Sequence, residues 1–148
     1  MSRIVSFRGL IESSGQDTIP LQTNNGLTGY RIVKFQMMTP NAGTTDYEHT
    51  IQIWKVEQTG TITAEVDFSD NRLLAAGFIE GAAATNFIGN PLHVIFDNEI
   101  FNQDIYITHF DSKSALACNY YIELEQMKLN LDEQSVATLK NIRNTGSQ

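Results

Sequence analysis

The stretch Tyr120-Tyr121-Ile122-Glu123-Leu124-Glu125 decides the fold class, because its apolar and polar side chains alternate with a period of two residues. The even-numbered side chains of this stretch would face a core, while its glutamates would face solvent. Such alternation is typical of a strand with one buried face in an antiparallel sheet. The phase slips by one residue near Gln126, and this slip predicts a bulge or a bend there.

Comparable runs recur along the chain at spacings of about 10–15 residues, and turn-forming residues separate them. Asn24-Asn25-Gly26 is a strong turn signal, residues 13–17 interrupt the first run, and residues 81–86 are expected to form a loop. Over residues 72–80 a helical turn is an alternative, but Gly77 weakens it. Strands are therefore expected at residues 3–12, 31–37, 50–57, 64–68, 72–80, 92–96 and 104–110, and from Tyr120 onward.

Residues 50–57 are apolar on both faces. Ile51 and Ile53 lie on one face of this expected strand, and Trp54 and Val56 lie on the other. A strand of this kind is covered on both sides. One cover is expected to be an opposing sheet, and the other is either a loop or a neighbouring subunit.

The C-terminal part of the chain changes to helical spacing. Asn130 is a candidate N-cap with Glu133 three residues later, which resembles a capping box. The following apolar residues repeat at a spacing of three, which predicts a short amphipathic helix over residues 131–144 with a narrow apolar stripe. The stripe comprises Val136, Leu139 and Ile142.

The length of 148 residues, 41% of them hydrophobic, suffices for one core and one domain. About eight evenly spaced strands favour an all-β antiparallel β-sandwich, with a jelly roll as the natural arrangement. We therefore expect a single β-sandwich domain over residues 1–148 that ends in the helix at residues 131–144.

The net charge of −7 comes from 10 basic and 17 acidic residues, and no basic cluster occurs. Binding to nucleic acid through phosphates needs several Lys or Arg contacts, so a nucleic-acid partner is not expected. No apolar run approaches the ~20 residues of a membrane span, and the N-terminus lacks the apolar region of a signal peptide. The protein is expected to be made in the cytoplasm, to stay soluble and to have no membrane partner.

His49, His93 and His109 are the candidate metal ligands among the histidines. A metal site needs three or four ligands that converge, and these residues show no paired spacing, so neither a metal nor another cofactor is expected. Cys118 is the single cysteine and is interpreted as a small buried apolar residue.

Catalytic motifs are missing from the sequence: neither a Gly-x-Ser-x-Gly nucleophile motif nor a glycine-rich phosphate loop occurs. Glu123 and Glu125 are interpreted as a solvated strand face rather than a pair of catalytic acids. An enzyme is therefore not expected.

Two aromatic residues are candidates for an interface with another subunit, since such interfaces are enriched in Trp and Tyr. Tyr121 shares a strand face with the two glutamates of its run, which favours an interface, whereas for Trp54 a core position is favoured over an interface. Together with the helical stripe, the candidate interface residues are Trp54, Tyr121, Val136, Leu139 and Ile142.

Four stretches resemble segments of virion structural proteins of marine tailed bacteriophages. They are residues 68–77 (FSDNRLLAAG), 95–109 (IFDNEIFNQDIYITH), 119–125 (NYYIELE) and 137–143 (ATLKNIR), and they cover much of residues 68–143. The resemblance implies a place in the virus particle and leaves open a capsid decoration protein, a neck or tail component, or a fibre adaptor.

We accordingly expect a non-enzymatic virion structural protein, most simply a capsid decoration or cement protein. Its expected partners are the major capsid protein or other virion proteins, and it is expected to form a homo-oligomer. The alternative is a neck, tail or fibre module that binds host-surface carbohydrate, because a β-sandwich supports either role.

Overall fold

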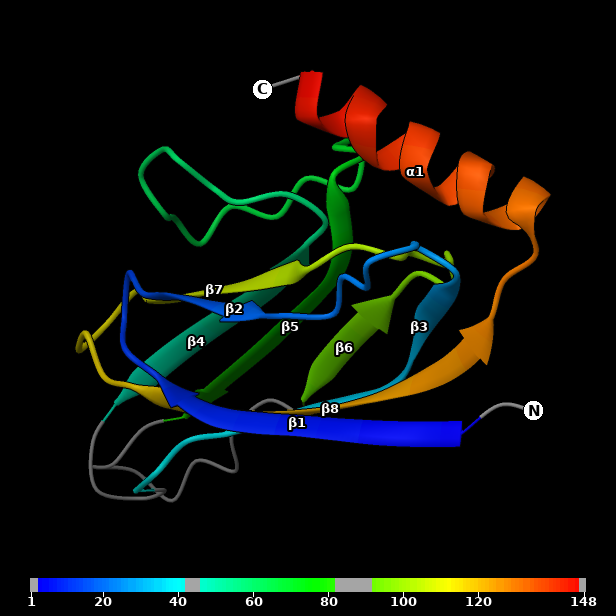
Figure 1. Cartoon of the computed structure of the whole chain (residues 1–148). Coiled ribbons are helices and arrows are strands. Elements are labelled where there is room, and N and C mark those ends of the chain that lie inside the picture. Colours follow the sequence, from blue (N-terminus) through cyan, green and yellow to red (C-terminus); the bar gives the residue numbers. More distant parts are fainter. Residues whose placement is uncertain (1–2, 42–45, 82–91, 147–148) are drawn as a thin grey trace.

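The computed structural model describes residues 3–41, 46–81 and 92–146, and of residues 141–146 the backbone alone. Two antiparallel sheets pack together, and one helix lies across one end of them (Figure 1). The first sheet has the order β1 (Arg3–Ile11), β8 (Cys118–Lys128), β3 (Thr28–Met38). The second has the order β2 (Gln16–Ile19), β7 (Ile105–Asp111), β4 (Tyr47–Trp54), β5 (Leu73–Gly81), β6 (His93–Phe96).

Strands from the first half of the chain pair with strands from the second half. β1 pairs with β8, β2 with β7 and β4 with β5, all antiparallel, so that the first strand of the described residues pairs with the eighth. These are pairs of a jelly roll, but β6 pairs with β5 and not with β3. The expected all-β sandwich of about eight strands is confirmed.

The core lies between the two sheets and is built from side chains that alternate along each strand. The alternation that the sequence shows in residues 120–125 is the observed one, with the even positions buried and the glutamates on the outer face. Fully burying one large aliphatic side chain contributes about 1.5–3 kcal/mol, so these strands supply much of the stability. The fully buried aliphatic residues include Ile51, Ile53, Ile105, Ile107, Ile122 and Leu124.

The expected strand at residues 64–68 is wrong, because this segment belongs to the long connection between β4 and β5. Its polar residues bond locally instead of to a neighbouring strand. The carboxylates of Asp67 and Asp70 accept hydrogen bonds from the backbone N–H groups of Ser69 and Arg72, two residues onward. Such Asx turns compete with strand pairing.

The same connection covers the outer face of β4. Gln52 Nε2 donates to the backbone carbonyl of Glu65 at 3.0 Å, and Trp54 is only 9% exposed. The sequence left a loop or a neighbouring subunit as the cover of the outer face of residues 50–57. In the structure a loop of the same chain covers this face.

Two further details differ from expectation. β2 forms where an interruption is expected, because Gln16 and Ile19 pair with Thr108 and Ile105 of β7. The bulge expected near Gln126 is wrong, since β8 continues through that position, and the register shift lies in β3 between Ile32 and Lys34.

The C-terminal helix α1 (Leu131–Gly146) begins where the capping residues place it. Asn130 Oδ1 accepts from the Glu133 N–H at 2.8 Å, and Glu133 Oε1 accepts from the Asn130 N–H at 3.1 Å, which confirms the capping box. The helix ends two residues beyond the expected range. In the described residues, no helix has both the length and the apolar character that a bilayer crossing requires.

Candidate functional site

Trp54 is enclosed by its own chain. Its indole Nε1 donates to Thr108 Oγ1 at 2.9 Å, and the Arg72 guanidinium lies 5.9 Å from the ring centroid. The loop of residues 58–67 and Asp70 close a mostly polar pocket of about 260 Å³ beside it. Gln52 is one of the lining residues, and its Oε1 atom is buried without a hydrogen-bond partner among the described residues.

Tyr121 lies on the outer face of the three-stranded sheet and is half-buried. Its hydroxyl donates to Glu123 Oε2 at 2.7 Å, and Lys34 Nζ lies 5.9 Å from the ring centroid. Arg31 and Glu125 form an ion pair on the adjoining strands. This face is therefore a network of charges around one aromatic ring, and the interface role of Tyr121 stays a prediction.

Helix α1 turns most of its apolar side chains outward. Leu131, Val136 and Leu139 are 72%, 54% and 59% exposed, whereas Ala137 is 7% exposed. The side chain of Ile142 lies outside the described residues. A groove of about 400 Å³ runs beside the helix, and its lining includes Ile100, Leu129, Val136 and Ala137.

A second apolar hollow of about 270 Å³ lies over β5 and β6, where Val66, Phe68 and Ile95 are exposed. A charged strip joins it to the helix groove, because this strip shares Phe68 with the hollow and Lys140 with the groove. We call the groove, the strip and the hollow, together with the exposed side chains of Leu131, Val136 and Leu139 on α1, the docking surface. The strip is lined by Lys55, Phe68, Asp70, Asn71, Leu73, Asp97, Glu99 and Lys140.

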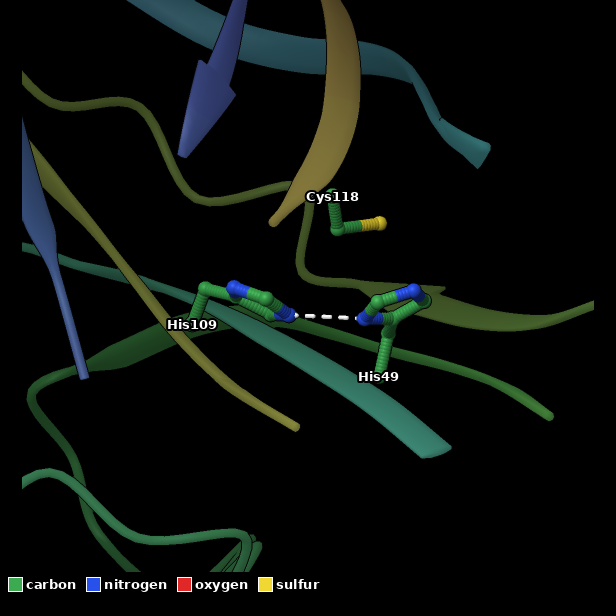
Figure 2. Close-up of side chains that lie close together, drawn as sticks. All are labelled: His49, His109 and Cys118. Atoms are coloured by element: carbon green, nitrogen blue, oxygen red, sulfur yellow. Dashed lines mark hydrogen bonds between the residues drawn. The ribbon is translucent and has the colours of Figure 1, made fainter. Parts of the chain in front are cut away.

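A separate cluster of His49, His109 and Cys118 lies inside the sandwich, and all three side chains are 0% exposed (Figure 2). β4 and β7 are neighbours, with His109 opposite Ile51, so the two histidines are diagonal neighbours on one sheet face. Cys118 comes from the first residue of β8 in the opposing sheet. One ligand atom from each residue can be chosen such that all three lie within 4.8 Å of one another.

The two imidazoles are joined by a hydrogen bond of 2.9 Å between His49 Nδ1 and His109 Nε2 (Figure 2). The other nitrogen of His49, Nε2, lies 3.1 Å from Thr39 Oγ1, and this hydroxyl can donate to it or accept from it. His109 Nδ1 is buried and has no hydrogen bond of good geometry to any described residue. The nearby carbonyls of Ile11 and Glu12 nevertheless act on His109 in the direction that raises its pKa.

Burial controls the protonation of this cluster. Loss of solvation, and next the neighbouring His109, lower the pKa of His49 to about 4, and burial also lowers the pKa of His109. Burial raises the pKa of the Cys118 thiol to about 12. At neutral pH the cluster therefore holds two neutral imidazoles and a thiol, each of which offers a lone pair.

The carboxylate of Asp111 is a fixed negative charge close to this cluster. It acts electrostatically on both histidines and on Cys118. Backbone N–H groups, among them those of Leu116 at 2.8 Å and Lys113 at 3.0 Å, hold it in place. These bonds lower the pKa of Asp111 against the opposing effect of burial, which is the largest single influence.

The three histidines were candidate ligands in the sequence, but the sequence did not predict that His49 and His109 lie beside Cys118. The available signal was strand phase, because His49 has the phase of Ile51 and Ile53, and Cys118 the phase of Ile122. The side chains of His49 and Cys118 therefore point from their own strands into the core of the sandwich. The burial expected of Cys118 is confirmed, whereas His93 is exposed on β6.

Comparison with known proteins finds no family model that matches the chain and no curated protein whose sequence matches it.

Proposed function

We propose that the chain is a non-enzymatic structural subunit of a virus particle, a decoration protein or a related virion component, which binds a neighbouring protein subunit through the docking surface. The observation that carries this proposal is the orientation of α1, which leaves Leu131, Val136 and Leu139 largely exposed. Exposed apolar side chains beside charged groups, as on α1 and the adjoining strip, are typical of a protein–protein interaction site.

The strength of such a contact can be scaled from the exposed side chains. Val136 and Leu139 are each a little more than half exposed. Fully burying one large aliphatic side chain yields about 1.5–3 kcal/mol, so covering the remaining surface of both yields about 2–3 kcal/mol together. One contact of this size is weak, but many copies related by symmetry make a stable assembly.

The first test is the composition of purified virus particles. Quantitative mass spectrometry of particles should detect the chain and give its copy number relative to the major capsid protein. Copies in the hundreds indicate a lattice position, and about a dozen copies indicate a vertex, neck or tail. Absence of the chain from purified particles would contradict the proposal.

The second test locates the contact. The double variant Val136→Glu/Leu139→Glu should lower incorporation into particles about 30-fold or more, as expected from the loss of 2–3 kcal/mol. The control Ile4→Glu/Leu10→Glu adds the same charge at residues of β1 that are 54% and 55% exposed. The proposal requires normal incorporation of the control, and equal incorporation of both variants would rule out α1 as the contact.

A carbohydrate-binding role is the second candidate, and the pocket beside Trp54 favours it. Hydroxyl, amide and carboxylate side chains line this pocket beside the indole of Trp54. Such groups form hydrogen bonds with sugar hydroxyls. A glycan array should then show binding that Gln52→Leu abolishes and Tyr121→Phe leaves intact, and an array without binding would dismiss this role.

A further inference from the structure

We propose that His49, His109 and Cys118 form a zinc(II) site inside the β-sandwich. The three residues come from β4, β7 and β8, and their ligand atoms gather within 4.8 Å. Imidazole nitrogen and cysteine sulfur are the donors that zinc prefers in proteins. This site is separate from the docking surface and does not depend on the proposed function.

The observed spacing is close to that of a metal-bound set. Two nitrogens that share a tetrahedral zinc ion at about 2.05 Å are about 3.3 Å apart, and a nitrogen and a sulfur are about 3.6 Å apart. His49 Nδ1 and His109 Nε2 are 2.9 Å apart. The nitrogen–nitrogen and nitrogen–sulfur distances of a zinc site are reached when the His49, His109 and Cys118 side chains move by up to about 1 Å. Small changes in their χ angles provide such movements.

The groups around the ligands suit a metal site. A histidine that binds a metal through one ring nitrogen usually donates the N–H of its other ring nitrogen to an oxygen. Thr39 Oγ1 lies 3.1 Å from His49 Nε2 and can accept such a bond. The second nitrogen of His109, Nδ1, has no hydrogen bond of good geometry to any described residue and is influenced by the carbonyls of Ile11 and Glu12.

The charges balance when zinc binds. The Cys118 thiol loses its proton to solvent as the zinc–sulfur bond forms, so one proton is released for each ion bound. When Nδ1 of His49 binds zinc, the proton of this neutral imidazole is on Nε2, which can donate a hydrogen bond to Thr39 Oγ1. Zinc(II), the thiolate and the Asp111 carboxylate then sum to zero, whereas copper(I) would leave one uncompensated negative charge in a buried place. Three protein ligands leave one position for a small ligand such as water.

Because all three side chains are fully buried, loading is expected during folding. The test unfolds the whole chain in denaturant with a chelator and refolds it with zinc(II), cobalt(II) or copper(I). After removal of excess metal, elemental analysis should find one zinc per chain, and the cobalt form should show a thiolate-to-cobalt charge-transfer band. Zinc should also raise the denaturant concentration at which Cys118, the single cysteine, becomes open to alkylation.

Matched variants identify the ligands. Cys118→Ser should abolish the charge-transfer band and weaken zinc binding more than about 100-fold, while His93→Gln, which changes an exposed histidine of β6, should leave both unchanged. The alkylation measurement uses the unaltered chain, so it stays decisive even where a core variant fails to fold. Refolded protein that retains no zinc and shows no change in Cys118 protection would overturn the site. Retention of copper(I) without zinc would overturn the assignment of the ion.

Discussion

Replacing Asp111 with asparagine should destabilise the fold strongly, because this carboxylate organises the turn between β7 and β8. Its side chain is 4% exposed. Oδ1 accepts from the backbone N–H groups of Glu48 at 3.1 Å, Lys113 at 3.0 Å and Ser114 at 3.4 Å, and Oδ2 accepts from that of Leu116 at 2.8 Å. Asparagine has nearly the same shape as aspartate, but it has only one acceptor oxygen and cannot accept the bonds that both carboxylate oxygens make.

The magnitude follows from those four hydrogen bonds. In its better orientation the introduced asparagine keeps the three bonds of Oδ1 through its amide oxygen, but its NH₂ group faces the Leu116 N–H. One buried donor is then unpaired, at a cost of about 1–3 kcal/mol. The three retained bonds lose their charge, and charge-assisted bonds are about twice as strong as neutral ones. We expect Asp111→Asn to lower the free energy of unfolding by about 2–4 kcal/mol in total.

Urea unfolding followed by circular dichroism measures this loss in free energy. The samples of the unaltered chain and of Asp111→Asn should both include a chelator, so that bound metal does not contribute to stability. For a domain of this size, the corresponding fall in Tm is about 5–15 °C. Asp132→Asn is the matched control, since Asp132 is exposed in the first turn of α1, and it should change stability by less than about 0.5 kcal/mol. A loss in Asp111→Asn no larger than that of the control would show that the carboxylate does not organise this turn.

Three further predictions concern separate parts of the fold. Asn130→Ala removes the side-chain half of the capping box and should cost about 1 kcal/mol, with reduced helical signal in circular dichroism. Gly77→Ala places a Cβ 2.6 Å from Met37 Sδ and 3.1 Å from the Phe35 ring, so urea unfolding should show a loss of about 1–3 kcal/mol from overpacking. Because Trp54 is the single tryptophan and is 9% exposed, its fluorescence should shift to longer wavelength on unfolding; an unshifted spectrum would contradict the enclosure of its ring.

The elements that the sequence predicts well are those whose pattern arises within one segment. The alternation in residues 120–125 and the capping box at Asn130 both depend on neighbours in the chain, and both are observed. Residues 64–68 alternate just as clearly, but alternation specifies a strand only where a partner strand is free to pair. The Asx turns at Asp67 and Asp70 direct this segment into a loop instead.

The buried cluster is beyond local reasoning for a related reason. His49 and His109 are 60 residues apart in the chain, and they meet because β4 pairs with β7. Strand phase indicates that each side chain points inward, but it does not indicate which strands are neighbours. Trp54 shows the same limit, since the residues that enclose it belong to a loop whose path no periodicity specifies.

The central position of β8 in the order β1-β8-β3 has a consequence for how the protein is made. A ribosome releases β1 and β3 before β8, the C-terminal strand of the described residues, and until then neither has its hydrogen-bonding partner in this sheet. In the nascent chain the backbone groups of β1 and β3 that later pair with β8 are therefore unpaired, and such strand edges are sites that a chaperone can bind. The three-stranded sheet therefore forms only after the synthesis of residue 128, whereas the five-stranded sheet does not contain β8.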